Sequence, residues 1–343
     1  MKIRKIVALG LTLCLSSAML FGCGCSIDSD TPIIGTLFGL EDNQVFKVDK
    51  LICTKPEYMV QVLNTANKHK AGFGGTVDWN SKITKNLTLS QYILDQVKED
   101  MSVKYTMASM AKEKLVTLSS GEEEAIKSAA HEYYSSLTDA EKEFTKAKEK
   151  DVEKIYKNYK LADKVYEKVT EDQDVTVSDE ETRAAKINYI RMNADKHDMK
   201  YIDKWLKFAR MNVKNGYQPF SREAKQFSDD DTYERIIYKN EAKKDFEKKV
   251  FDMNSGELSK IIQDGKDYYI IQCIDNYLKK ESLENKNRLI DKNKKEYFNK
   301  EYKKYLDDVS TDFNSSSVED VKLPTGGEYV HYNLLSIYNS KIK

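Results

Sequence analysis

The side chains that most often carry chemistry are few in this sequence and fall into no familiar catalytic pattern. Only four of the 343 residues are histidine, and their spacing does not resemble that of metal ligands on one element. These are His69, His131, His197 and His331. The sequence also shows no Ser-His-Asp order, glycine-rich phosphate loop or paired carboxylates that rise above chance. We therefore predict neither a bound metal nor a cofactor.

Two cysteines, Cys53 and Cys273, lie in the part of the chain that we expect to fold. They could form a disulfide, but a separation of about 220 positions carries little information without geometry. The sparse cysteine usage favours two separately buried thiols, and pairing stays open.

A third cysteine, Cys23, ends a leader that is typical of secreted proteins. The stretch MKIRKIVALGLTLCLSSAMLFGC has a basic start and then an apolar run too short for a stable spanning helix. Its last four residues, Leu20–Cys23, resemble the bacterial lipobox, in which the cysteine becomes lipidated. We expect a signal peptide over 1–22, lipidation at Cys23 and a tether over 23–42. This would place the protein on the extracytoplasmic face of a bacterial cell membrane. An ordinary signal peptide with an incidental cysteine is the alternative.

The charge distribution argues against nucleic acid as a partner. The chain has 56 basic and 56 acidic residues, interspersed without a basic block, and its formal net charge is +0. A third of the residues are charged, 22 are tyrosine and only four are proline. This composition indicates long exposed helices with tyrosine-rich seams.

Residues 43–175 are predicted to form a helical domain, preceded by one or two short strands over 44–54. Apolar residues recur every three or four positions from Leu89 to Leu115, and again over 152–169, as on one face of an amphipathic helix. Polar pairs typical of helix starts precede the helices: Thr54 with Glu57, Thr88 with Gln91, and Thr138 with Glu141.

An acidic, turn-like stretch over 170–183 marks a boundary, and a second domain is predicted over 176–278. Its patterns give the order β-α-α-β-α-β-β, closed by the strands within GELSKIIQDGKDYYIIQCIDNY (256–277). The last part, 279–343, contains an apolar stripe over 281–310 and a loop-like tail around Pro324. We expect this helix to pack on 88–170 and complete a discontinuous helical domain.

Residues 246–276 resemble the closing helix and strands of the parvulin-type (PpiC) peptidyl-prolyl isomerase domain. The matching features are Gly256-Glu257-x-Ser259 and a tyrosine-rich strand that ends in Ile270-Ile271. The plan of leader, helical region, insert and returning helix resembles the PrsA/SurA class of extracytoplasmic folding factors over about 43–310. The resemblance implies an α+β protein: a mostly helical N- plus C-terminal chaperone domain with an inserted parvulin-like βααβαββ domain.

Parvulins resemble one another in surrounding the prolyl bond with two facing strand histidines, a nearby Asp or Cys, and apolar groups beneath the proline ring. In this sequence the two histidine positions fall on Tyr189, or its neighbour Asn188, and on Tyr269. The acidic position falls near Glu234. The resemblance implies three apolar substrate-binding residues: Phe246, Ile190 and Phe251.

The resemblance implies a membrane-anchored folding factor that binds unfolded or secreted polypeptides. Because both family histidines are replaced, we expect its isomerase activity to be weak or lost. An active peptidyl-prolyl isomerase with a tyrosine-lined proline slot is the alternative, and a dimer remains possible. A small-ligand-binding lipoprotein would need many parallel strands, which the high helix content disfavours.

Overall fold

The computed structural model describes residues 40–171, 176–239 and 244–343. The predicted signal peptide and the Cys23 lipidation site lie outside these residues, as does most of the tether. The chain divides into two compact units. The first contains the described residues through Glu171 together with those from Lys295 onward, and the second contains the residues between them. Helix α10, Lys279–Asp308, begins in the second unit and ends in the first.

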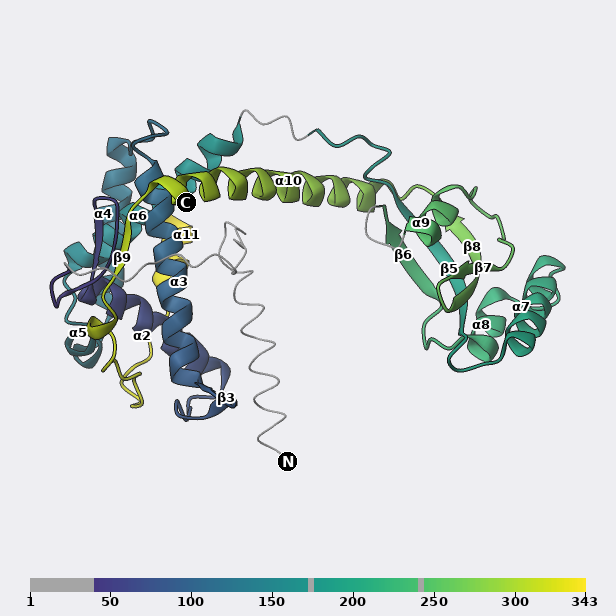
Figure 1. The fold of residues 1–343 in the computed structure, drawn as a ribbon, viewed down its shortest axis with the longest axis horizontal. Helices are drawn as coiled ribbons and strands as arrows, with labels where there is room; N and C mark the ends of the chain where they lie inside the picture. Colours follow the sequence, from purple (N-terminus) through teal and green to yellow (C-terminus); the bar gives the residue numbers. More distant parts are fainter. Residues whose placement is uncertain (1–39, 172–175, 240–243) are drawn as a thin grey trace. The chain divides into compact units, whose positions relative to one another are not determined.

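The first unit is mainly helical, and its strands form two small sheets with the orders β2-β1-β9 and β3-β4 (Figure 1). Besides the end of α10, its elements are β1 (Gln44–Val48), β2 (Leu51–Thr54), α2 (Lys55–Gly72), β3 (Lys82–Thr84), β4 (Leu87–Thr88), α3 (Leu89–Met110), α4 (Ser120–Ser136), α5 (Asp139–Thr145), α6 (Glu149–Glu171), β9 (Thr311–Phe313), the short 3-10 helix η1 (Ser315–Ser317) and α11 (Leu334–Lys341).

Local sequence signals explain where several of these helices begin. Thr88 and Gln91 form a reciprocal capping box at the start of α3, as predicted, and Thr138 and Glu141 form another at α5. The capping box predicted for Thr54 with Glu57 is wrong, because the Thr54 side chain caps no backbone N–H of α2.

Glu57 is instead turned into the interior, where its side chain is 1% exposed. Its carboxylate accepts hydrogen bonds from Lys154 Nζ at 2.7 Å and from the hydroxyl of Tyr105. A buried carboxylate needs such partners, and this requirement outweighs the local capping interaction. The predicted α3 stripe also ends early. Leu115 lies beyond the helix, is 89% exposed and adopts a positive φ of 55°.

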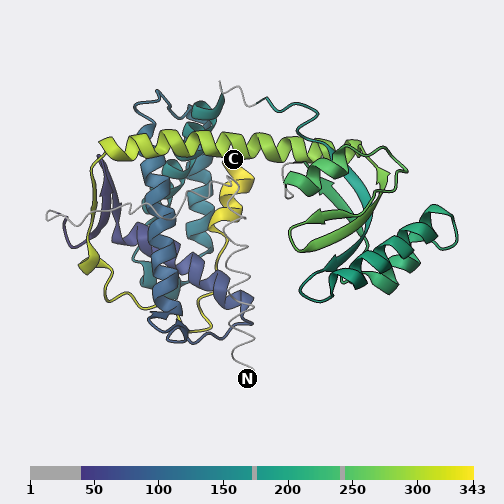
Figure 2. The ribbon, with the colours of Figure 1, turned by 45° about the vertical axis from the view of Figure 1, so that its right-hand side comes forward.

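The core of the first unit is closed by segments from the far end of the sequence. Phe298 and Tyr302 of α10 are fully buried in a cluster with residues of α3 and α6. Helix α11 contributes Leu334, Ile337 and Tyr338 to a second cluster with α2, α4 and α6. Figure 2 shows α11 lying along this helical bundle. The stretch around Pro324 is a loop, as predicted, while β9 and α11 on either side of it pack against the first unit.

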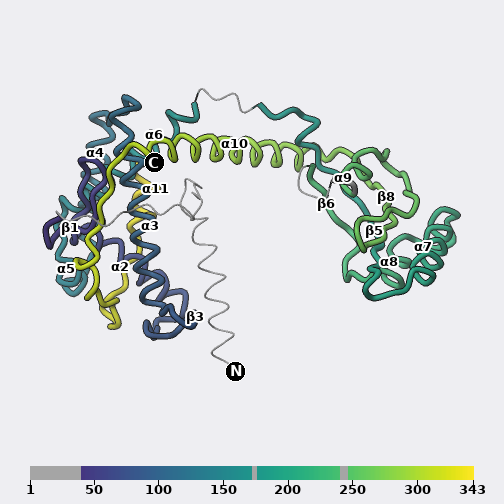
Figure 3. Tube along the Cα trace, viewed as in Figure 1, coloured from purple at the N-terminus to yellow at the C-terminus, as the bar shows by residue number. Residues whose placement is uncertain are grey.

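The second unit contains the predicted β-α-α-β-α-β-β order, which can be followed in the tube of Figure 3. Its strands make one antiparallel sheet with the order β6-β5-β8-β7. The elements are β5 (Ala184–Asn193), α7 (Met199–Lys214), α8 (Phe220–Phe227), β6 (Glu234–Tyr238), α9 (Lys244–Phe251), β7 (Ile262–Asp264) and β8 (Asp267–Asp275). The predicted α+β fold class is confirmed.

Strand β5 lies in the middle of this sheet, and its alternating side chains enter two different hydrophobic clusters. Ile187 and Tyr189 point to one face and pack with α9, whereas Ile190 and Met192 point to the other and pack with α7 and α8. Odd-numbered residues of β5 therefore face α9, and even-numbered residues face α7 and α8.

Both cysteines in the described part of the chain are buried free thiols. Cys53 lies in the first unit and Cys273 in the second, which confirms two separate thiols. Within the described ranges, no helix combines the length and the apolar character needed to cross a membrane.

Candidate functional site

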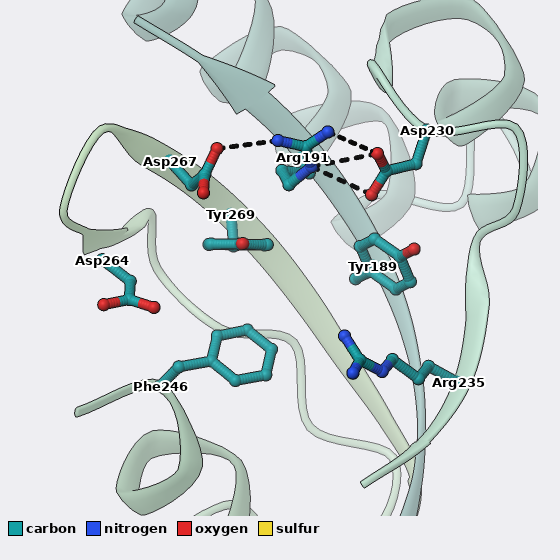
Figure 4. Close-up of a pocket in the computed structure, with 8 residues that line it drawn as sticks. All are labelled: Tyr189, Arg191, Asp230, Arg235, Phe246, Asp264, Asp267 and Tyr269. Atoms are coloured by element: carbon teal, nitrogen blue, oxygen red, sulfur yellow. Dashed lines mark hydrogen bonds and ion pairs between the residues drawn. The ribbon is translucent and has the colours of Figure 1, made fainter. Parts of the chain in front are cut away.

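A pocket of about 390 Å³ opens on the α9 side of the four-stranded sheet (Figure 4). It brings together side chains from β5, β6, β7, β8, α9 and the segment before β6. The lining residues are Tyr189, Arg191, Asp230, Arg235, Phe246, Asp264, Asp267 and Tyr269. Three aromatic rings and five charged groups therefore surround one cavity.

The two tyrosines share a sheet face because of the register between β5 and β8. Tyr189 pairs with Ile271 and Arg191 with Tyr269, and directly paired residues of antiparallel strands project to the same side. The two tyrosine rings have centroids 6.5 Å apart. Phe246 of α9 lies closer to Tyr269, with centroids 4.8 Å apart and ring planes inclined by 56°. The three rings form an apolar wall on this side of the pocket.

Arg191 lies next to Tyr269 on the same sheet face and forms the charged part of the pocket wall. Its Nε donates to Asp230 Oδ2 at 2.9 Å and its Nη1 donates to Asp267 Oδ1 at 2.8 Å. A second guanidinium nitrogen, Nη2, also donates to Asp230, so this pair is bidentate. Figure 4 shows the guanidinium lying between the two carboxylates.

The segment before β6 is held along β5 by backbone contacts, and these place Asp230 beside Arg191. Asp229 N donates to Arg191 O at 2.7 Å, and Tyr189 N donates to Tyr233 O at 2.8 Å. The Asp229 carboxylate also accepts the backbone N–H of Asn193 at 2.7 Å. Asp230 is thus positioned by strand-like pairing as well as by its ion pair.

These contacts set the protonation states around the pocket. Hydrogen bonds from Arg191 hold the pKa of Asp230 below its ordinary value, and the positive charge of Arg191 acts in the same direction. Burial raises the pKa of Tyr269 to about 12, with a further contribution from the charge of Asp267. At neutral pH the pocket therefore contains an ionised Asp230 and a neutral phenol at Tyr269.

Arg235 differs from Arg191 in having no acidic partner among the described residues. It lies on β6 opposite Ile187, which directs it to the pocket face, and its side chain is exposed. Figure 4 shows its guanidinium on the side of the pocket nearest Tyr189 and Phe246. Its charge is available to a group that enters the pocket.

The structure brings together three of the six candidate residues that resemblance to parvulins suggested. Tyr189, Tyr269 and Phe246 line the pocket. Phe251 lies in the same hydrophobic cluster but outside the lining, with the Arg183 guanidinium 5.3 Å from its ring centroid.

The other two candidates, Ile190 and Glu234, lie on the face of the sheet opposite the pocket. Ile190 is fully buried in the cluster with α7 and α8. Glu234 pairs with Asn188, which lies two residues before Ile190 and so faces the same side of the sheet. The Glu234 carboxylate lies 3.4 Å from Lys186 Nζ. A one-residue offset in a strand moves a side chain to the opposite face, so Arg235 occupies the pocket position instead.

Asp230 is an acidic residue that does line the pocket, and it was not predicted from the sequence. It ends the sequence QFSDD (226–230), which begins in the last turn of α8. That pattern was the available signal for an acidic residue near the end of the α8 segment. The Arg191–Asp267 contact could not have been found in the same way, because it depends on the register between β5 and β8.

Chemically, the site can bind a compact apolar group against its aromatic wall and present hydrogen-bond donors beside it. It offers the Tyr269 hydroxyl, which stays protonated, and the Arg235 guanidinium. Within the described ranges, no group of three His, Cys, Asp or Glu side chains is arranged to hold a metal ion. The pocket residues are therefore suited to binding and to electrostatic stabilisation.

This part of the chain matches a known domain family. Residues 185–275 match the family model "Rotamase: PPIC-type PPIASE domain". The matched range begins at the second residue of β5 and ends with β8, so it contains the sheet apart from Ala184 and every residue that lines the pocket. The predicted parvulin-type peptidyl-prolyl isomerase domain is confirmed for these residues.

Several solved structures match most of the length of the chain. The peptidylprolyl isomerase PrsA of Bacillus cereus is 18% identical, with 76% of this chain and 98% of that one covered and a TM-score of 0.35. The foldase protein PrsA of Lactococcus lactis is 11% identical, with coverages of 86% and 98% and a TM-score of 0.34. A SurA-like chaperone structure from Campylobacter jejuni is 12% identical, with coverages of 79% and 99% and a TM-score of 0.29. No sequence match is found among curated proteins.

Proposed function

We propose that this protein is an extracytoplasmic folding factor whose parvulin-type domain binds prolyl segments of unfolded polypeptides with little catalysis of their isomerisation. The observation that carries the proposal is the pocket of the matched domain. Tyr189, Tyr269 and Phe246 form an aromatic wall around a cavity of about 390 Å³. Such a wall suits the apolar face of a proline ring.

Isomerisation requires more than binding. Rotation about an X-Pro bond has a barrier of roughly 18–20 kcal/mol, and an enzyme lowers it only by binding the twisted amide more tightly than the planar one. Donors and charges must therefore be aimed at groups that change during rotation. Here the carboxylate of Asp230 is occupied by the Arg191 guanidinium. This arrangement supports retention of the binding surface together with weak catalysis.

The wider role rests on resemblance and on the leader sequence. We infer that a lipid attached at Cys23 anchors the chain to the outer face of the cell membrane, and that the helical unit contributes to binding of unfolded secreted chains. Clients without fixed shape favour broad, shallow contacts over a deep specific pocket. The anchor is tested by mass spectrometry of the membrane-extracted protein, and a peptide chain without a lipid-modified Cys23 would contradict it.

Binding and catalysis are separated by two measurements on the full chain. Titration with a short Ala-Pro-Phe-type peptide should perturb NMR signals of Tyr269 and Phe246, whereas the same peptide with alanine for proline should not. A prolyl isomerisation assay should give acceleration far below that expected for an efficient isomerase. Absence of proline-dependent perturbation at the pocket would contradict the proposed binding role.

The second candidate is an active isomerase that uses the tyrosine hydroxyls as donors. It is favoured by the neutral phenol of Tyr269 beside an open cavity. In that case Tyr269→Phe and Tyr189→Phe should each lower kcat/KM by about tenfold or more, the value of a lost hydrogen bond in the transition state. Tyr277→Phe is the matched control, because Tyr277 is 45% exposed and does not line the pocket. Equal activity in all three variants would exclude this candidate.

A further inference from the structure

Helix α7 of the second unit has an exposed apolar flank that the pocket does not use. Its buried face is formed by Ile202, Leu206 and Ala209, which pack into the sheet and α8. On the neighbouring side the helix presents a row of large side chains, hereafter the aromatic flank: Tyr201, Trp205, Phe208 and Met211. Their spacing of three and four residues places them in one row along the helix.

The aromatic flank is both exposed and held in a defined arrangement. Tyr201, Phe208 and Met211 are 42%, 42% and 45% exposed. Trp205 stacks on Phe227 of α8 with centroids 5.1 Å apart, and Phe208 packs edge-on against Trp205 at 5.7 Å. The flank is therefore a preorganised surface, and little side-chain entropy would be lost on docking.

The same helix carries a strong excess of positive charge, although the whole chain is neutral. Within Met199–Lys214 there are five basic residues and one acidic residue, Asp203. Asp203 forms an ion pair with Lys207 at 2.7 Å. Three exposed lysines have no acidic partner among the described residues: Lys200, Lys204 and Lys214. The Lys204 ammonium lies 4.7 Å from the Trp205 ring centroid, so charge and aromatic surface are adjacent.

We propose that the aromatic flank of α7 docks onto an anionic lipid surface. A basic helix with exposed Trp, Tyr, Phe and Met combines the two attractions that hold amphipathic helices at an interface. Aromatic side chains enter the headgroup boundary, and lysines are attracted to anionic headgroups. The unpaired lysines favour this occupant over an unfolded client, because apolar binding alone would not require them.

The chain contains a built-in reporter for this contact. Of its two tryptophans, Trp205 belongs to the aromatic flank, whereas Trp79 is 6% exposed in the core of the first unit. Full-length protein is mixed with vesicles of phosphatidylglycerol or of phosphatidylcholine, each carrying brominated acyl chains that quench nearby indoles. A Trp205→Phe variant measures the quenching of Trp79 alone and is subtracted.

We expect Trp205 to be quenched by the phosphatidylglycerol vesicles and released by about 0.5 M salt, since salt screens lysine–headgroup attraction. Substitution of Lys200, Lys204 and Lys214 by glutamine should weaken docking on the order of a hundredfold, from about fivefold for each lysine. The matched control replaces three exposed lysines of the first unit, Lys85, Lys127 and Lys157, and should dock as the parent does.

Either of two results would overturn the proposal. One is quenching of Trp205 that is equal with neutral and anionic vesicles, or absent with both. The other is a Trp205 emission shift caused by reduced, carboxymethylated lysozyme in the absence of vesicles while anionic vesicles have no effect. The second result would assign the aromatic flank to unfolded polypeptides instead.

Discussion

Replacement of Arg191 by glutamine should destabilise the parvulin-type unit and change its response to pH. The guanidinium forms ion pairs with both Asp230 and Asp267. The side chains of Arg191, Asp230 and Asp267 are 22%, 27% and 20% exposed. Glutamine keeps the three side-chain carbons of arginine but lacks the guanidinium, so the substitution removes the bidentate pair and leaves the apolar stem in place.

The expected cost is about 2 kcal/mol of unfolding free energy. Hydrogen bonds to charged groups contribute roughly 1.5–3 kcal/mol each, and a buried pair that loses one partner costs about 3–5 kcal/mol. The range of roughly 1.5–3 kcal/mol applies because both carboxylates are partly exposed and can form hydrogen bonds with water after the substitution. Asn193 also continues to donate to Asp267, at 2.6 Å.

The pH dependence follows from Asp230. Its pKa in the folded protein lies below the ordinary value of 3.8, chiefly because of Arg191. Its contribution to stability is therefore complete above that value and is lost as the pH falls through the folded pKa. The stability difference between parent and Arg191→Gln should be largest near pH 7 and should shrink as the pH falls below about 4.

Urea unfolding of the full chain is followed by tryptophan fluorescence, from which the Trp79 signal of a Trp205→Phe variant is subtracted. The remaining signal reports this unit, because Trp205 is its one tryptophan. Arg235→Gln is the matched control: it removes the same charge from the same pocket, where no acidic partner is lost. It should change stability by less than about 0.5 kcal/mol. Equal stability of the Arg191 and Arg235 variants at pH 7, or a gap that persists unchanged at pH 3, would refute the reasoning.

Three further outcomes are expected. Phe298→Ala should lower the unfolding free energy of the first unit by about 3–5 kcal/mol, measured in urea by circular dichroism, because the buried ring would leave a cavity. Glu141→Gln should speed hydrogen exchange over 328–333, since the Glu141 carboxylate accepts two backbone N–H groups and the His331 imidazole there. Cys53 and Cys273 should react with a thiol reagent only after unfolding, because both are fully buried.

Two of these predictions have a matched control variant. Leu283→Ala on the same helix as Phe298 should have little effect, since Leu283 is 59% exposed. Glu143→Gln should leave exchange over 328–333 unchanged, because its side chain is 77% exposed. If a control variant had the same effect as its test variant, the contacts described would be contradicted. Rapid labelling of either cysteine in the native protein would contradict its burial.

The elements themselves were largely predictable from local patterns. The stripes over 89–115 and 152–169 correspond to α3 and α6, and the second unit has the predicted order. Such patterns are informative because each helix or strand must bury one face, whatever it packs against. The parvulin-type resemblance also came from a short stretch, 246–276, whose turn residues and strand pattern are local.

The structure of the tail after α10 could not be predicted from local sequence patterns. The tail lacks a long apolar stripe, yet β9 pairs with β1 and α11 packs in the helical core. The Glu141 carboxylate binds His331 across 190 positions. Short segments of this kind are stabilised by partners remote in sequence, so their own residues carry only a weak signal.

For the site, the sequence by itself determined which residues are aromatic, which are charged, and that Tyr189 and Tyr269 stand on strands. Only the tertiary structure decided which of their neighbours reach the pocket. Register between β5 and β6 turned Glu234 away and Arg235 inward, and pairing along β5 placed Asp230 beside Arg191. The physical reason is that side chains alternate between sheet faces, so membership of a site depends on strand pairing that no single segment encodes.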